Sequence, residues 1–138
     1  MDVSARGSLR LGPRVTFLGG MIPTQIRVHA GASLEIGEAS VANYGAFLEA
    51  RERVRIGARC MLASMVRISD SDGRRTAPVV LGDDVWVAHG AIIGPGVTVG
   101  DGSVVGAGSV VWQNVAAGSL AMGNPARVMN LSLVSSDS

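Results

Sequence analysis

The chain has 138 residues, of which 47% are hydrophobic but only 4% aromatic, and its formal net charge is +1. This length predicts one domain, residues 1–138, and the nearly neutral charge excludes nucleic-acid or membrane binding driven by bulk charge. The single cysteine, Cys60, excludes a disulfide within the chain. The sequence does not open with a signal-peptide pattern and has no apolar run long enough to span a bilayer, so we expect a cytoplasmic protein.

The first part of the chain carries only a weak repeat. Residues 1–11 show none and are expected to form an irregular lead-in to coils over residues 12–127. A six-residue repeat is then readable at Leu18, Thr24, Ala30 and Ile36. Twenty residues separate Ile36 from Ile56, two more than three hexads, which predicts a small insertion at a corner around residues 42–46.

The second half of the chain carries a strong six-residue repeat of aliphatic residues, at Leu81, Val87, Ile93, Val99, Val105 and Val111. A Gly or Ala follows five of these six, and four residues after each comes another small or apolar side chain. Neither an α-helix nor an alternating strand repeats every six residues, whereas a parallel β-helix does. The aliphatic residue then points to the axis, and the small residue after it passes a crowded bend. Three hexads per coil predict an all-β fold of about six coils.

Two segments depart from this repeat. Thirteen residues separate Ile68 from Leu81, one more than two hexads, and the polar residues 69–78 are expected to leave the coil there as a loop. Residues 128–138 lose the repeat and are expected to form a C-terminal tail, frayed at residues 135–138. Cys60 lies four residues after an inward aliphatic residue, so we expect a buried core residue rather than a reactive thiol.

Three stretches, residues 81–100, 105–111 and 123–128, resemble the hexapeptide-repeat acyltransferases. The pattern is nearest to the maltose, galactoside and polysaccharide O-acetyltransferases, and it covers about residues 30–130. The resemblance implies a left-handed parallel β-helix, a homotrimer, and acyl-CoA bound between neighbouring subunits. It also implies direct acetyl transfer from acetyl-CoA to the hydroxyl or amine of a sugar or another small-molecule or glycan acceptor.

The resemblance further assigns residues to the site. Ala107, in Gly-Ala-Gly-Ser, matches the position whose backbone meets the CoA arm, and Arg127 matches the basic residue that reaches the CoA phosphates, which suits a guanidinium. Asn43 matches the asparagine on the acceptor side. Alternatives stay open: Arg127 as a solvated terminal residue, and Asn43 as a residue that tolerates the unusual backbone of an inserted corner.

The chain departs from the family pattern at the position of the general base. Related sugar O-acetyltransferases carry a histidine in the loop after Ile68, whereas this chain has Ser71, Gly73 or Arg74 there. His89, in Ala-His-Gly, matches the register of the catalytic histidine of other hexapeptide acyltransferases, and a neutral imidazole can accept the acceptor's proton. We predict that His89 is the base, with a CoA contact, a structural role or an unidentified base left open; His29 is a lesser candidate.

Two other functions compete with acyl transfer. A non-catalytic trimeric scaffold or sensor would explain the missing loop histidine. A zinc enzyme of this fold needs three histidine ligands, and the chain has only two histidines, so no metal is expected.

Overall fold

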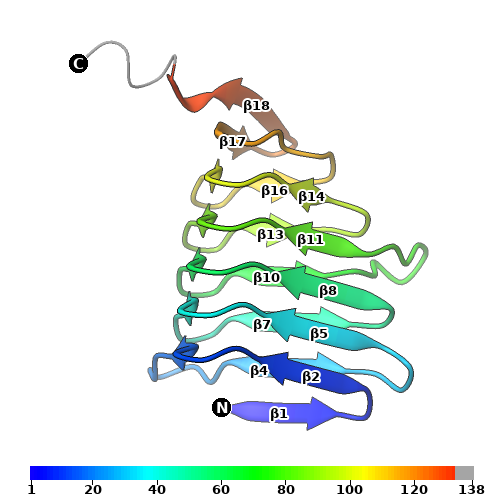
Figure 1. Ribbon diagram of the computed structural model, residues 1–138. Helices are drawn as coiled ribbons and strands as arrows, with labels where there is room; N and C mark the ends of the chain where they lie inside the picture. Colours follow the sequence, from blue (N-terminus) through cyan, green and yellow to red (C-terminus); the bar gives the residue numbers. More distant parts are fainter. Residues whose placement is uncertain (133–138) are drawn as a thin grey trace.

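The computed structural model describes residues 1–132, which form a three-sided stack of coils (Figure 1). The chain winds repeatedly through three sheets, one on each side of the stack, and every strand pairs in parallel with its equivalent in the next coil except at the C-terminal end. The prediction of an all-β parallel β-helix is therefore confirmed. With five or six parallel strands per side among the described residues, the number of coils is close to the six expected.

We name the three sides face A, face B and face C in the order in which the chain visits them. Face A contains β1 (Asp2–Ala5), β4 (Gln25–Val28), β7 (Phe47–Ala50), β10 (Arg67–Ser69), β13 (Ile92–Ile93) and β16 (Val110–Val111). Face B contains β2 (Ser8–Leu11), β5 (Ser33–Ile36), β8 (Arg53–Ile56), β11 (Val79–Leu81) and β14 (Thr98–Val99). Face C contains β3 (Thr16–Phe17), β6 (Val41–Ala42), β9 (Met61–Leu62), β12 (Trp86–Val87), β15 (Val104–Val105), β17 (Ser119–Gly123) and the antiparallel β18 (Ala126–Asn130).

The strong repeat forms the core as predicted. The six repeated aliphatic side chains are all at most 1% exposed. Leu81 pairs directly with Val99, its equivalent three hexads later in the sequence, so three hexads make one coil. Cys60 is also buried, at 1% exposed, and burial raises the pKa of its thiol, as expected of a core rather than a reactive cysteine.

The glycines of the repeat meet two separate constraints. Gly100 follows an inward aliphatic residue, and a Cβ there would clash with the backbone nitrogen of Ala117, so the bend is crowded as predicted. The left-handed backbone, however, falls two residues later, at Gly102 with φ +69°, where a Cβ would meet open space. One glycine is therefore selected by packing between coils and the other by backbone conformation.

The lower coils differ from the prediction. Residues 1–11 are not irregular, because β1 and β2 pair with the strands of the next coil. Leu18 and Ala30 are exposed rather than inward, whereas Thr24 and Ile36 are buried as expected. The register shifts because longer strands such as β4 and β5 each bury two side chains, whereas short hexad strands such as β14 bury one.

The two-residue insertion lies at a different corner from the one predicted. Six residues separate the inward positions Ile36, Ala42 and Leu48, but eight separate Leu48 from Ile56, so the extra residues are at Arg51 and Glu52 and not at residues 42–46.

The loop is larger than predicted. Ile68 on face A and Leu81 on face B lie on adjacent sides, so their interval of thirteen positions spans a single corner and exceeds one hexad by seven (Figure 1). The C-terminal tail is also shorter than expected, because β18 continues to Asn130. Residues 135–138, expected to fray, lie outside the described residues. Within residues 1–132, no helix is long and apolar enough to cross a bilayer.

Candidate functional site

Three of the four predicted site residues lie at one edge, the C–A corner, where face C turns into face A. Ser64, His89 and Ala107 occupy the same turn position in successive coils. The backbone N–H of Gly90 donates to the Ser64 carbonyl at 3.1 Å, and that of Gly108 donates to the His89 carbonyl at 2.9 Å. Tyr44 continues this column below, so the adjacent Asn43 lies at the same corner.

Free backbone donors run along this column. The N–H groups of Ser64, His89 and Ala107 donate to no acceptor within residues 1–132. We call these stacked N–H groups the ladder; His89 and Ala107, which carry two of them, are exposed residues. An extended chain of amides laid against the corner could accept hydrogen bonds from these groups.

The His89 ring is held at one nitrogen only. Its Nδ1 lies 2.7 Å from the Ser64 hydroxyl, which can either donate or accept, so the contact does not select a tautomer. The Nε2 atom has no partner within the described residues.

Asn43 has an ordinary local role in addition to its predicted one. Its side-chain oxygen accepts the N–H of Tyr44 at 2.8 Å. Asn43 itself does not have positive φ, which falls on Gly45 instead (φ +72°), and the inserted corner lies elsewhere. The alternative that Asn43 tolerates an unusual backbone is therefore wrong.

Arg127 lies at the end of the stack, on β18. It pairs with Met122 of β17, and the Met122 sulfur lies over Gly106, next to Ala107. The Arg127 side chain is exposed and makes no ion pair within residues 1–132. It is therefore available at the upper end of the C–A corner.

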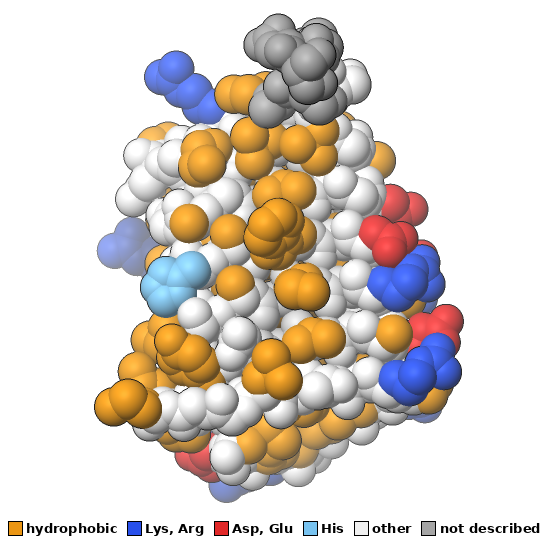
Figure 2. Space-filling view, turned by 90° about the vertical axis from the view of Figure 1, so that its left-hand side faces the viewer, with side chains coloured by type: hydrophobic (Ala, Val, Ile, Leu, Met, Phe, Trp, Pro, Cys, Tyr) orange, Lys and Arg blue, Asp and Glu red, His pale blue; other side chains and the backbone are white. Residues whose placement is uncertain are grey.

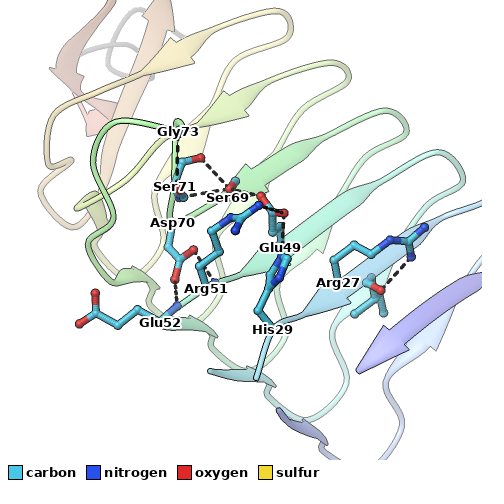
Figure 3. Close-up of polar contacts among 10 residues, drawn as sticks. Arg27, His29, Glu49, Arg51, Glu52, Ser69, Asp70, Ser71 and Gly73 are labelled. Carbon is cyan, nitrogen blue, oxygen red and sulfur yellow. Dashed lines mark hydrogen bonds and ion pairs between the residues drawn. The ribbon is translucent and has the colours of Figure 1, made fainter. Parts of the chain in front are cut away.

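A second polar cluster lies on face A beside the A–B corner, and it is shown in Figure 3. His29 Nε2 lies 3.0 Å from one Glu49 oxygen, and the Ser69 hydroxyl donates to the other at 2.9 Å. Arg51 approaches the same carboxylate at 3.7 Å. Burial raises the pKa of Glu49, but the hydrogen bonds from His29 and Ser69 and the charge of Arg51 outweigh it, so the net shift is downward.

The fully buried Asp70 fixes the backbone around this cluster. Its carboxylate accepts the N–H groups of Arg51, Glu52 and Arg53, each at 2.8 Å. These three N–H groups belong to the inserted corner, where the regular backbone hydrogen bonds between coils are interrupted. Asp70 thereby holds the coil that carries Glu49.

Two hollows adjoin the cluster. The loop cleft, of about 420 Å³, lies between face A and the 70–78 loop, and its lining includes Phe47, Glu49, Arg51, Arg67, Ser69, Ser71, Ile92 and Trp112. The Arg67 guanidinium stacks 4.2 Å above the Phe47 ring in this cleft. A lower hollow of about 540 Å³ is lined by Ser4, Arg6, Arg27, Val28, His29 and Ala30.

The sequence did not reveal Glu49 as the partner of His29, or Ser69 as the second partner of Glu49. Glu49 and Ser69 pair across β7 and β10, and Glu49 pairs with Arg27 of β4, so these residues form one column. Finding this column required the lengths of the irregular lower coils, which the weak repeat did not reveal. No group of three or more His, Cys, Asp or Glu side chains is arranged to hold a metal ion within residues 1–132.

Face C presents an apolar surface, visible as orange side chains up the middle of Figure 2. Successive strands place Val41, Met61, Trp86, Val104 and Leu120 in register on this face. Met61 and Trp86 are each about half exposed, at 51% and 53%. Charged pairs such as Arg59 with Asp84 line the neighbouring B–C corner.

Comparisons with known proteins agree with the fold. A family described as bacterial transferase hexapeptide (six repeats) matches residues 78–111. A maltose O-acetyltransferase from Clostridium difficile 630 superimposes with a TM-score of 0.74 and 34% identity, covering 86% of this chain and 67% of that chain. A hexapeptide-repeat acetyltransferase from Vibrio cholerae O1 biovar eltor, solved with acetyl coenzyme A, gives a TM-score of 0.72 and 30% identity, covering 88% of this chain and 69% of that chain.

A candidate acetyltransferase of Dictyostelium discoideum is 39% identical over 115 residues, which cover 75% of this chain. The chain spans 60% of the length of that relative.

Proposed function

This chain belongs to the hexapeptide-repeat acyltransferases, and we propose that it transfers an acetyl group from acetyl-CoA to a sugar hydroxyl or amine. The observation that carries the proposal is the ladder of free N–H groups at the C–A corner, with Arg127 at its end. The solved Vibrio relative holds acetyl coenzyme A, and the Clostridium relative is a maltose O-acetyltransferase.

The pantetheine arm of CoA suits the C–A corner. It is an extended chain with amide carbonyls, which the N–H groups of His89 and Ala107 can satisfy. Gly108 and the small Ala107 side chain let such an arm approach the backbone closely. The CoA phosphates would then reach Arg127, whose guanidinium is suited to bidentate contact with phosphate oxygens.

The apolar side chains of face C favour a second and third copy of this chain as neighbours. An exposed Trp86 and Met61 in one register column are typical of a surface that is covered in an assembly. We therefore propose a homotrimer, with CoA in the cleft between neighbouring subunits and with Asn43 facing the acceptor.

The reaction needs a proton acceptor, and the chain offers two histidines. His89 is the base that the sequence predicts, and its Nε2 is free of partners within the described residues. It also lies in the ladder proposed to bind CoA, so its role could be a CoA contact. The scaffold alternative remains for a protein that binds CoA and transfers nothing.

The test combines binding and turnover. Calorimetry should detect acetyl-CoA binding, and Arg127→Ala should weaken it by about 1–3 kcal/mol, the cost of losing a charged hydrogen bond. Arg10→Ala, an exposed arginine on face B, is the matched control and should leave the affinity unchanged. Turnover with a panel of hydroxyl and amino sugars tests transfer, and light scattering on the same sample tests the trimer.

Three results would contradict the proposal. Absence of CoA binding removes the acyltransferase assignment, and binding without transfer to any sugar of the panel favours the scaffold. A monomer mass contradicts the trimer.

A further inference from the structure

We propose that His29, oriented by Glu49, accepts the proton of the acceptor in the acetyl transfer. The inference rests on the proposed function and deepens it, because it assigns the base to a histidine outside the C–A corner. It is carried by the contact between His29 and Glu49 at 3.0 Å and by the two hollows that this pair adjoins.

The first step concerns the tautomer of His29. Glu49 is an ionised carboxylate at neutral pH, since its pKa is lowered, and an ionised carboxylate only accepts hydrogen bonds. The Nε2 atom of His29 must therefore carry the proton that it shares with Glu49. The Nδ1 atom of the neutral ring is then left with a lone pair, which is the arrangement a general base needs.

The second step concerns how firmly Glu49 is held. Its side chain is only 15% exposed, and the Ser69 hydroxyl occupies its second oxygen. Asp70 anchors the corner that immediately follows β7, through the N–H groups of Arg51 and Glu52. The carboxylate is thus fixed, whereas His29 remains 40% exposed at its side chain and can be reached by a ligand.

The third step concerns location. Glu49 lines the loop cleft and His29 lines the lower hollow, so the bonded pair links the linings of two hollows beside the A–B corner. The 70–78 loop closes one side of the loop cleft and contains no histidine. His29 reaches the lining of this cleft through its contact with Glu49.

The contrast with His89 favours His29 on chemical grounds. Ser64, the partner of His89, is a neutral hydroxyl that selects no tautomer and brings no negative charge to the ring. Glu49 does both for His29, because its negative charge stabilises the imidazolium that forms when the proton is taken. In this assignment His89 contributes its backbone N–H to the ladder proposed to bind CoA.

The reaction balances with His29 as the base. The acceptor O–H or N–H bond breaks, its proton moves to His29 Nδ1, and the freed electron pair forms a bond to the thioester carbonyl carbon of acetyl-CoA. The carbon–sulfur bond then breaks, and its electron pair stays on the sulfur of CoA as a thiolate. The thiolate takes up the proton from the imidazolium, so that His29 returns to its neutral form and CoA leaves as a thiol.

The kinetic test replaces each histidine by glutamine. His29→Gln keeps an N–H that can donate to Glu49 but removes the proton acceptor, and His89→Gln tests the rival base. Arg10→Gln, at an exposed arginine on face B, is the control. We expect His29→Gln to lower kcat by ~10²–10⁴-fold with unchanged CoA affinity, His89→Gln to lower kcat much less, and Arg10→Gln to leave it unchanged. An active wild type whose His29→Gln variant stays within tenfold of it overturns the inference and leaves the proposed function intact. A wild type that transfers to no acceptor overturns the proposed function itself.

A spectroscopic test needs no turnover. The chain has two histidines, so their ring ¹⁵N resonances can be assigned by comparison with the two glutamine variants. We expect neutral His29 in the wild type to be protonated on Nε2, and Glu49→Gln, which removes the charge of this positioning residue, to shift the ring toward a mixture of tautomers and to lower kcat. A wild-type His29 protonated on Nδ1 overturns the inference whether or not transfer is observed.

Discussion

The upper and lower coils build the same prism in two different ways. In the upper coils, over residues 79–121, most equivalent positions are three hexads apart, as Leu81 and Val99 are. In the lower coils the interval grows by two residues between Leu48 and Ile68, and it is longer still between Ile68 and Ile93, across the loop that follows. The regular hexads form continuous backbone hydrogen bonds between coils and have few side-chain contacts at their corners. The insertions interrupt these hydrogen bonds and introduce polar side chains that replace the missing acceptors.

The largest expected difference between these regions is at Asp70. Replacement by Ala leaves three backbone N–H groups of the inserted corner without their acceptor, so Asp70→Ala should lower the free energy of unfolding by about 2–4 kcal/mol. Asp101→Ala is the control in the upper coils, where the carboxylate accepts one exposed N–H, that of Asp83, and the loss should be about 0.5–1 kcal/mol. Urea denaturation of both variants at one protein concentration measures the difference. Equal losses would mean that the inserted corner does not depend on its carboxylate.

This comparison also explains what the sequence could predict. Val99 and Val105 could be placed in the core because a hexad repeat specifies side, depth and neighbour together. Glu49 could not be placed, because its contacts with His29 and Ser69 depend on intervals that match no simple repeat. His89 could be proposed as a site residue because it lies in the regular hexads, where its register can be compared with that of related enzymes.

The sequence also predicts the two-residue insertion at the wrong corner, because the repeat is irregular in this part of the chain. Counting from Ile36 to Ile56 shows that two residues are extra, but the count is the same for an extra pair at any corner of that coil. Only pairing between strands shows that Leu48 to Ile56 is the long side. The polarity of Arg51 and Glu52, next to the equally polar loop one coil later, was the signal that could have located it.

A smaller effect distinguishes the two kinds of glycine in the upper coils. Gly100→Ala forces a Cβ against the backbone of Ala117, in the next coil, and should lower the free energy of unfolding by about 1–3 kcal/mol. Gly102→Ala has open space for its Cβ but keeps φ at +69°, and should lower it by about 1 kcal/mol. Thermal or urea unfolding of the two variants ranks them. A larger loss for Gly102→Ala would mean that the left-handed backbone at this corner constrains the fold more than crowding between coils does.

The smallest effect is a pH dependence confined to the lower coils. The pKa of Glu49 in the folded protein is below its ordinary value of 4.5, because the hydrogen bonds from His29 and Ser69 and the charge of Arg51 outweigh the effect of burial. A depressed pKa means that ionised Glu49 stabilises the fold at pH above 4.5, and that this stabilisation is lost as the pH falls through 4.5 and then through the lower folded value. Glu49→Gln cannot titrate there, so the free energies of unfolding of wild type and variant should differ at neutral pH and converge in acid. Unfolding in urea from about pH 7 to about pH 3 measures the convergence, with Glu35→Gln, an exposed carboxylate 4.0 Å from Arg55 on face B, as the control for loss of a surface charge. If the difference in free energy of unfolding between wild type and Glu49→Gln stays constant across this range, ionised Glu49 is not specifically stabilised by its partners. That result would remove the electrostatic reason for assigning the proton on His29 to Nε2.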